Sequence, residues 1–438
     1  MGSGGDRTMA ASSEAPAAAL AALDAETEFD AAKGLVYNKS KRSKYMTEKD
    51  LSELPLLQRV NWLSTTIIFF PAIAFCIGCA FVPLRKPTFY LFLVQYILTG
   101  LGITGGYHRL WSHTSYTASL PVELVLLAWG AAAFEGSARW WCRNHRAHHR
   151  YVDTKGDPYR IDKGFLYAHV GWMVLKQDTR QVGRVDITDL NKHKLIMLQH
   201  RYYLPIALFF GFVLPVTIGT LGWGDFWGSL VYAGFGRMFF VHQATFCVNS
   251  LAHAIGEQTY SKEHTSYDSV ITALVTFGEG YHNAHHEFPH DYRNGFRWYH
   301  YDPTKWVIRF LAFFGLCSNL VSFPENEIEK AKIQIIQADL DERKKHVDWG
   351  VPEEELPEMT WDEMRARHDA GEALVAVNGF VHKVDEFMDK HPGGRKILQF
   401  WIGRDATLAF NGEVYRHSKA ARNLLVHFRI AVLKEKLE

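Results

Sequence analysis

The sequence predicts an all-α integral membrane protein with four transmembrane helices under a polar helical cap, followed by a small soluble domain. Three observations predict this fold class. Four long stretches are almost free of charged residues, eight of the 22 histidines fall in three short clusters outside those stretches, and the composition becomes that of a soluble protein after residue 323. The apolar stretches define the expected membrane core, and the histidine clusters indicate where its chemistry lies.

The charges of the chain nearly cancel, since 48 lysines and arginines stand against 47 aspartates and glutamates and leave a net charge of +1. A chain without a strong positive charge has no general electrostatic attraction to nucleic acid, so we expect no nucleic-acid partner. The five cysteines are odd in number and form no CxxC pair. This pattern argues against a disulfide scaffold or a thiolate zinc site, so a bound metal is expected to be held by histidine.

The N-terminal residues 1–50 are rich in alanine, glycine, serine and charged residues and show no apolar periodicity. They lack the basic segment and short apolar run of a cleavable secretory signal. We therefore expect a disordered leader over residues 1–50, followed by a membrane domain with its cap over residues 51–323.

Two uncharged apolar stretches, 63–82 and 87–107, follow the leader. With a rise of 1.5 Å per residue, a helix of about 20 residues spans roughly 30 Å, the thickness of a bilayer core. A short connection containing Arg85 and Lys86 separates the two stretches. They are therefore expected to form a transmembrane hairpin.

Two further spans are expected after a long polar connector. The stretch 202–221 is uncharged, whereas 226–249 contains Arg237 and His242. We expect 226–249 to span the membrane with its last turns outside the bilayer or facing a protein interior, because a charged side chain in contact with lipid is costly.

The distribution of basic residues predicts the topology. The segment before the first expected span and the connector 108–201 both carry many lysines and arginines. By the positive-inside rule both lie in the cytosol, and four crossings return both termini to that side. Two shorter apolar stretches, 120–134 and 306–317, cannot span a bilayer and are expected to be interfacial or buried helices.

Eight histidines form three clusters with the patterns HxxxxH, HxxHH and HxxHH. Positions i, i+3 and i+4 of a helix lie on one face, so each HxxHH can aim three imidazoles at one point. The HxxxxH pair is five residues apart and needs a helix end or a distorted helix to face one point. Because an even number of crossings separates the clusters, all eight imidazoles can meet on the cytosolic face: His108, His113, His145, His148, His149, His282, His285 and His286.

The number of imidazoles indicates the kind of metal site. Imidazole suits zinc, copper, iron and nickel, so the ligand type does not by itself decide the metal. A structural zinc ion needs four ligands rather than eight, and the zinc-peptidase pattern HExxH does not occur. The excess of ligands predicts a two-metal site, and a pair of redox-active iron ions would suit chemistry with O2.

The clusters lie in three longer strings, GGYHRLWSH, RWWCRNHRAHHRYVDTKGDPY and TFGEGYHNAHHEFPHDYRNGFRWY. These strings resemble the membrane acyl-CoA Δ9 (stearoyl-CoA) desaturases, and the similarity covers about residues 55–325. The resemblance implies four transmembrane helices under a cytosolic cap that holds a di-iron centre. It also implies a ninth histidine ligand, His253, and an asparagine that acts through water, Asn249, because the string NSLAH matches that motif. Their i, i+4 spacing would place both on one helix face.

The same resemblance implies a substrate. The family binds a saturated fatty acyl-coenzyme A with its chain in a bent internal tunnel. Trp141 corresponds to a tunnel-lining tryptophan and Arg143 to a cationic contact with the coenzyme A head group, for which arginine is chemically suited. Gly136, Asn144 and positions 162–163 depart from the pattern of the animal enzymes, which points to the fungal branch.

Beyond the membrane domain, residues 325–346 form a highly charged helical pattern that gives way to a segment with two prolines. A segment of ordinary soluble composition begins at about residue 359. We expect a charged linker over residues 324–357 and a separate domain over residues 358–438.

Three strings in this last domain are HPGG, GRDAT and YRHSKAARNLL. Their histidines, His391 and His417, could clamp a planar cofactor from both faces. The set resembles cytochrome b5, an α+β domain whose two histidines in these strings ligate haem b. Two imidazoles fill both axial positions of a haem iron, so the expected role is electron transfer.

The two modules complement each other, because a di-iron oxygenase needs electrons one at a time and a tethered haem domain supplies them at a high effective concentration. The resemblance implies a multi-pass desaturase of the endoplasmic reticulum membrane, surrounded by lipid. It would insert a cis double bond at C9–C10 of stearoyl- or palmitoyl-CoA, using O2 and electrons from NADH-cytochrome b5 reductase. Its cofactors would be two iron ions and haem b.

Two alternatives stand beside this interpretation. One is another membrane di-iron desaturase or hydroxylase of different regiospecificity, and the other is a membrane-anchored haem electron carrier. The first group usually carries its haem domain at the N-terminus, and front-end desaturases begin the third cluster with glutamine where this chain has His282. The intact histidine clusters argue against a pure electron carrier.

Overall fold

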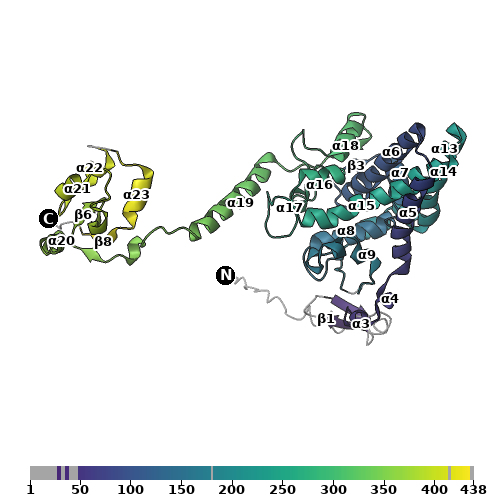
Figure 1. Ribbon diagram of the computed structural model, residues 1–438. Helices are drawn as coiled ribbons and strands as arrows, with labels where there is room; N and C mark the ends of the chain where they lie inside the picture. The colour runs from purple at the N-terminus through teal and green to yellow at the C-terminus, as the bar shows by residue number, and fades with distance from the viewer. Residues whose placement is uncertain (1–26, 31–34, 39–47, 179–180, 413–415, 435–438) are drawn as a thin grey trace, which may run out of the picture. The chain divides into compact units, whose positions relative to one another are not determined.

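The computed structural model describes residues 27–30, 35–38, 48–178, 181–412 and 416–434 (Figure 1). The chain divides into two compact units, Met1–Ile335 and Ile336–Glu438. The leader expected over residues 1–50 falls largely outside the described residues. Its described parts are an antiparallel pair of strands, β1 (Thr27–Asp30) and β2 (Leu35–Asn38), and the first residues of helix α3 (Glu48–Glu53).

Three helical segments of the first unit are long and apolar enough to cross a membrane. They correspond to the first three expected spans and are Trp62–Phe81 (α5), Lys86–Ser112 and Tyr203–Trp223. The second consists of α6 (Lys86–Leu101) and a π-helix, η1 (Gly102–Ser112). The third consists of α12 (Tyr203–Leu208), a short π-helix η4 (Phe209–Val213) and α13 (Leu214–Trp223).

The fourth expected span is helical but is not among the long apolar helices of the described residues. It is formed by α14 (Phe226–Gly228), the π-helix η5 (Ser229–Gly236) and α15 (Arg237–Ser250). Of the four predicted spans, three therefore correspond to helices long and apolar enough to cross a membrane, and Arg237 and His242 make the fourth segment more polar than these. Both side chains are buried, and η5 packs against α5, α6 and α13. The polar segment thus lies inside the bundle.

The two shorter apolar stretches form helices that are each buried on one side and exposed on the other. Helix α7 (Leu120–Ala132) packs against η1, α6 and α12. Helix α18 (Pro303–Phe313) buries Thr304 and Ile308 on one side and leaves Phe310 and Phe313 exposed on the other. This amphipathic pattern agrees with the interfacial helix expected there.

Three elements of the cap hold the expected histidine ligands other than His108 and His113. They are α8 (Ala138–Tyr151), the 3-10 helix η6 (Leu251–His253) and α17 (His282–Glu287). Helix α8 begins where Ser137 accepts a hydrogen bond from the backbone N–H of Trp140, as expected for a serine N-cap. A buried core beneath α8 includes Tyr107, Trp111 and Cys142, which fixes the helix against η1.

The second unit is an α+β domain, as expected. Its four-stranded sheet has the order β5-β8-β7-β6, in which β5 pairs with β8 in parallel and the other pairs are antiparallel. The strands are β5 (Glu358–Met359), β6 (Leu374–Val377), β7 (Phe380–Lys383) and β8 (Arg429–Leu433). The helices are α20 (Trp361–Asp369), α21 (Arg395–Trp401), α22 (Thr407–Asn411) and α23 (Lys419–Val426).

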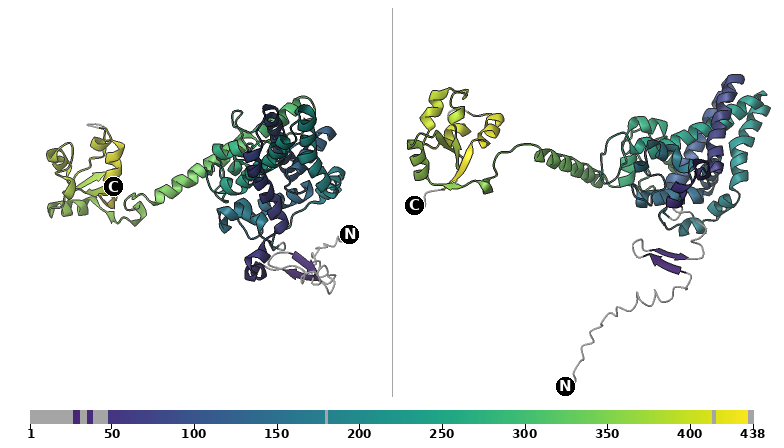
Figure 2. Two further views of the ribbon diagram at one scale, coloured as in Figure 1. Left: turned by 45° about the vertical axis from the view of Figure 1, so that its right-hand side comes forward. Right: turned by 60° about the horizontal axis from the view of Figure 1, so that its bottom comes forward.

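The charged pattern at 325–346 forms one continuous helix, α19 (Glu325–Lys345), in both views of Figure 2. Exposed ion pairs at i, i+3 follow its surface, such as Lys330 with Glu327 and Lys344 with Asp341. Each exposed pair of this kind contributes a few tenths of a kcal/mol at most. The helix is therefore polar along most of its length.

Candidate metal and haem centres

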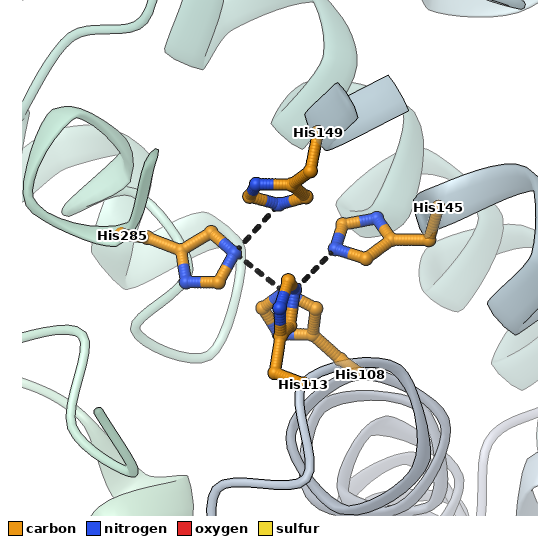
Figure 3. A group of neighbouring side chains, drawn as sticks. All are labelled: His108, His113, His145, His149 and His285. Carbon is orange, nitrogen blue, oxygen red and sulfur yellow. Dashed lines mark hydrogen bonds between the residues drawn. The ribbon is translucent and has the colours of Figure 1, made fainter. Parts of the chain in front are cut away.

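All nine expected histidine ligands meet in the cap, where they form two groups. Within each group the ligand nitrogens lie within 4.8 Å of one another. The first group, drawn in Figure 3, contains His108, His113, His145, His149 and His285. The second group contains His148, His253, His282 and His286. Each HxxHH cluster contributes to both groups, a division that the sequence does not indicate.

The distances between nitrogens fit one metal ion in each group. In the first group, His285 Nε2 lies 2.9 Å from the Nε2 atoms of both His108 and His149 (Figure 3). In the second, His282 Nε2 lies 3.0 Å from those of His253 and His286. Two ligands at right angles around a metal with bonds of about 2.1 Å lie about 3.0 Å apart. The spacing is thus that of adjacent ligands of a single ion.

The π-helix η1 aligns the HxxxxH pair. The backbone N–H of His113 donates to His108 O at 3.1 Å, an i to i+5 bond. Because a π-turn contains one more residue than an α-turn, residues five apart lie on one face. This confirms the expected distortion at the end of the second span.

Helix α15 ends before the ninth histidine. It stops at Ser250, and Leu251–His253 continues as the 3-10 helix η6. Asn249 and His253 therefore do not lie on one continuous α-helix. The expectation that they share one face of such a helix was wrong. Asn249 nevertheless lines the same cavity as His148 and His282 of the second group.

Burial keeps the imidazoles available as ligands. Burial first, and then the neighbouring imidazoles, lowers the pKa of seven of the nine histidines well below its ordinary value. A neutral imidazole retains the lone pair that a metal requires. The seven are His113, His145, His149, His253, His282, His285 and His286.

In the second group, the Nδ1 atom of one ligand contacts a carboxylate directly, and that of another contacts a carboxylate through a threonine hydroxyl. Asp157 Oδ2 lies 3.0 Å from His148 Nδ1, and both side chains are buried. His253 Nδ1 lies 3.0 Å from Thr265 Oγ1, which donates to Asp153 Oδ1 at 2.7 Å. Such contacts fix the ring orientation and tautomer, leaving Nε2 for the metal.

In the first group, Glu279 lies behind His108. Glu279 Oε2 is 2.8 Å from His108 Nδ1, and Arg109 contacts Glu279 at 2.7 Å and Asp302 at 2.9 Å. Burial by itself would raise the pKa of Glu279, but the Arg109 guanidinium and His108 together lower it to about 2. Glu279 is therefore ionised and holds the Nδ1 proton of His108.

The third cluster is fastened to the chain around it by Asn283. This fully buried side chain accepts hydrogen bonds from the N–H groups of Tyr260 and Ser261 and donates to the carbonyls of Ser261 and Ser266. The loop so held contains Thr265, which contacts His253. Sequence reasoning treated Asn283 as a spacer between His282 and His285. It also overlooked Asp157, Thr265 and Glu279, which contact their histidines from irregular segments, and Asp153, which accepts a hydrogen bond from Thr265.

A largely apolar cavity of about 410 Å³ reaches both groups. It is lined by His108 and His145 of the first group and by His148 and His282 of the second. Apolar walls come from several helices and include Ile67, Tyr96, Ile103, Val241 and Phe277. The volume lies in the usual range of small-molecule sites, and the composition suits an alkyl chain.

The two expected substrate contacts differ in their position. Trp141 lines the cavity and stacks on His145, with ring centres 4.9 Å apart. Arg143 does not line this cavity, whereas its neighbour Asn144 does. The Arg143 guanidinium donates to Asn144 Oδ1 at 2.9 Å and to Gly183 O at 3.4 Å. Trp141 is thus placed beside the metal site, and Arg143 lies outside the cavity.

In the second unit, the imidazole rings of His391 and His417 lie close to each other. Their ring centres are 6.4 Å apart. Two imidazoles on opposite sides of one iron, with bonds of about 2.0 Å and about 1.1 Å from nitrogen to ring centre, have ring centres about 6.2 Å apart. His417 Nδ1 lies 3.0 Å from Phe410 O, which leaves Nε2 for iron. The pair therefore fits the axial ligands of a haem.

Comparison with known protein families agrees with both sites. Residues 86–314 match the family model described as "Fatty acid desaturase". Residues 360–434 match the model described as "Cytochrome b5-like Heme/Steroid binding domain". The first range contains all nine clustered histidines, and the second contains His391 and His417.

Three curated relatives are desaturases by name, and the two fungal ones match most of the chain. The chain is 49% identical over 399 residues to a "Probable acyl-CoA desaturase" of Schizosaccharomyces pombe, covering 91% of this chain and 82% of that protein. It is 45% identical over 382 residues to "Acyl-CoA desaturase 1" of Saccharomyces cerevisiae, covering 86% and 74%. It is 38% identical over 264 residues to a "Stearoyl-CoA desaturase" of Homo sapiens, covering 58% and 71%.

Two histidine groups around an apolar cavity, a separate bis-histidine domain and these similarities all lead to one conclusion. The chain belongs to the fatty acid desaturase family and carries a cytochrome b5-like domain at its C-terminal end.

Proposed function

We propose that the protein is a membrane acyl-CoA Δ9 desaturase that inserts a cis double bond at C9–C10 of stearoyl- or palmitoyl-CoA. The observation that carries this proposal is the apolar cavity lined by members of both histidine groups. An alkyl chain lying in it passes beside both metal positions. The names of the curated relatives, which specify acyl-CoA or stearoyl-CoA, support the same substrate class.

The nine histidines would hold two iron ions, five around one and four around the other, with Asn249 contributing through water. When bound, these ions supply the oxidising power to remove two hydrogens with O2. The overall reaction reduces O2 to two water molecules with four electrons, two from the broken C–H bonds and two from an external donor, together with two added protons.

The side chains of the protein position the substrate. Trp141 stacks on His145, so a chain packed against its indole lies within reach of the first histidine group. The apolar walls exclude water from this region, which protects the site against side reactions. Glu279 and Asp157 hold the proton on Nδ1 of His108 and His148, respectively, so that Nε2 faces the metal.

The haem domain would deliver the electrons. His391 and His417 would hold haem b, and a bis-imidazole iron passes single electrons without binding O2. We propose that these electrons come from NADH through a separate cytochrome b5 reductase. We further propose residues 51–323 as the desaturase domain, 324–357 as the linker and 358–438 as the haem domain.

We place the enzyme in the endoplasmic reticulum membrane with both termini in the cytosol. The fourth crossing would be the segment Phe226–Ser250, whose polar side chains Arg237 and His242 face the helical bundle. Arg143, outside the cavity but on α8, would contact the coenzyme A head group.

One experiment tests the proposed reaction. The chain is expressed in a desaturase-deficient host, and the position of the double bond in the cellular fatty acids is determined by gas chromatography with mass spectrometry. We expect cis-Δ9 products. Double bonds at another carbon would contradict the regiospecificity, and hydroxy fatty acids would contradict the desaturase assignment.

A further inference from the structure

A buried carboxyl group, Glu135, lies in the wall of the cavity where an alkyl chain is expected. It is 7% exposed and belongs to the cavity lining together with Trp141 and Thr245. Its Oε2 accepts a hydrogen bond from Trp141 Nε1 at 3.2 Å, and its Oε1 accepts one from Thr245 Oγ1 at 2.8 Å. A carboxyl group is unusual in an apolar wall, because burying its ionised form without a compensating charge is unfavourable.

The backbone on both sides of Glu135 is fixed in a tight turn. Phe134 has φ of 60° and Gly136 has φ of 95°, so both neighbours adopt left-handed conformations. Gly136 suits this position, because a Cβ there would lie 2.6 Å from the Trp140 ring. A left-handed phenylalanine is strained, so surrounding contacts must maintain the turn.

Buried side chains from other helices supply these contacts. Arg237 donates to Ala132 O, and His242 Nε2 lies 2.8 Å from Ala133 O. The N–H of Gly136 donates to the hydroxyl of Tyr203 at 3.1 Å. Three side chains thus form hydrogen bonds with the backbone of this turn. The turn places the Glu135 carboxyl group in the cavity wall.

The carboxyl group of Glu135 has no ion pair within the part of the chain that the structure describes. Among the described residues, no lysine, arginine or histidine forms an ion pair with it, and Arg237 is engaged with main-chain carbonyls, including Gly211 O at 3.1 Å. The neighbouring titratable groups are the phenols of Tyr107 and Tyr203, the imidazole of His242, and His200 further along the cavity. Burial raises the pKa of Glu135 to about 8, although the bonds from Thr245 and Trp141 act in the opposite direction. The group is therefore mostly protonated at neutral pH.

We propose that binding of an alkyl chain against Trp141 is linked to the protonation of Glu135, whose carboxyl group must be neutral for the chain to bind. The neutral acid presents a polar but uncharged surface to the chain. The ionised acid would have to lose its remaining contact with water when the chain covers it, and binding would then be weak. This inference rests on the proposed function, because it takes the cavity to be the acyl site.

The proposal predicts a coupling between binding and protonation. If acyl-CoA binds the neutral form, its binding raises the pKa of Glu135 further, and a proton is taken up above pH 8. The apparent affinity then falls about tenfold for each pH unit above about 8. At saturating substrate the bound enzyme remains protonated, so KM rises with pH while kcat stays nearly constant.

The test compares the full-length wild type with Glu135→Gln. The amide keeps the size and acceptor oxygen of the side chain but cannot ionise. We expect kcat/KM of the wild type to fall about tenfold between pH 7 and pH 9, through KM. Whatever its value at pH 7, kcat/KM of Glu135→Gln should change by less than about twofold over the same interval. Glu353→Gln, at an exposed position in the second unit, is the control and should follow the wild type.

Several outcomes would overturn the proposal. An equal fall in kcat/KM above pH 8 in the wild type and Glu135→Gln would do so. A fall in kcat with no change in KM would do so as well. Iron content and the Soret band establish whether the variant is folded and loaded. If it is not, proton uptake by the wild type on binding acyl-CoA without O2 at pH 8.5 decides, and its absence overturns the proposal. A wild type that makes no Δ9 product at pH 7 would instead contradict the proposed function.

Discussion

Asp157 Oδ2 lies 3.0 Å from Nδ1 of His148, and both side chains are shielded from solvent. This contact joins the irregular segment after α8 to the second histidine group. It fixes the tautomer in which Nε2 of His148 points toward His286, 3.2 Å away.

Replacing Asp157 by alanine should weaken metal binding at the second group. The expected loss of iron affinity is about 10- to 100-fold, the usual effect of removing a hydrogen-bond partner of a histidine ligand. Iron per polypeptide, measured after dialysis against a chelator, should fall from two toward one, with turnover falling in parallel. Asp157→Asn keeps an acceptor oxygen and should lose less iron, and retention of both ions by Asp157→Ala would contradict the role.

Replacing Asn283 by alanine removes four buried hydrogen bonds at once. It leaves two backbone N–H groups and two carbonyls without this partner, and each uncompensated buried group costs about 1–3 kcal/mol. We expect the loop that carries Thr265 to loosen and the second group to lose its iron first. The iron content and the thermal unfolding temperature measure these effects. Asn326→Ala, on the exposed start of α19, is the matched control and should leave both unchanged.

His285 connects two other members of the first group, so His285→Ala should abolish double-bond formation. The haem site lies in a separate unit, and the Soret absorption should therefore persist. Product analysis and visible spectra of one preparation give both readouts. His346→Ala removes an exposed histidine just after α19 and should remain active. Normal turnover by His285→Ala would exclude His285 from the metal site.

His391→Ala should remove the Soret band and stop the reaction, because one axial ligand of the haem is lost. Addition of free cytochrome b5 should restore turnover in part, since the desaturase cap is unchanged. His427→Ala, in the same domain but outside the haem pair, should retain the Soret band. If His391→Ala turns over normally without an added donor, the fused domain is not the electron source.

Acid should destabilise the haem domain through His382. This side chain is 1% exposed, and burial, reinforced by Arg429, lowers its pKa to about 4. The unfolded chain takes up a proton near pH 6.5. The contribution of His382 to the free energy of unfolding is therefore fully present above about pH 6.5, and it is lost as the pH decreases toward 4. Between pH 7.5 and pH 5 the loss should be about 2 kcal/mol.

Denaturant unfolding of the full chain, followed at the Soret band, measures this loss. His382→Leu cannot take up the proton, so its stability should change less over the same interval. His346→Leu serves as an exposed control and should behave as the wild type. Equal acid sensitivity in the wild type and His382→Leu would contradict the assignment.

The sequence was sufficient for the parts of the site that depend on local spacing. HxxHH predicts three imidazoles on one helix face, and the i+5 spacing of His108 and His113 required a distortion, which the structure provides as a π-helix. The closeness of His391 and His417 likewise agrees with what the short strings predicted. These predictions succeed because each depends on helix geometry or on a short motif.

The parts that sequence reasoning missed depend on contacts between distant segments. The division into five and four ligands depends on how α8 and α17 face each other, which no local pattern encodes. Thr265 meets His253 because Asn283 holds the intervening loop. Arg237 predicted a polar fourth helix, but its acceptors at Ala132 and Gly211 lie 105 and 26 residues away in sequence.

The π-helix at the end of the second span also changes how ligand patterns should be compared between proteins. A pair separated by five positions on a π-turn and a pair separated by four on an α-turn present their side chains in the same direction. Deleting one residue between His108 and His113 would therefore be compatible with an intact site if the turn reverted to α-helix. The quantity that the metal site requires is the angle between the two side chains around the helix axis, and the residue count expresses that angle only together with the helix type.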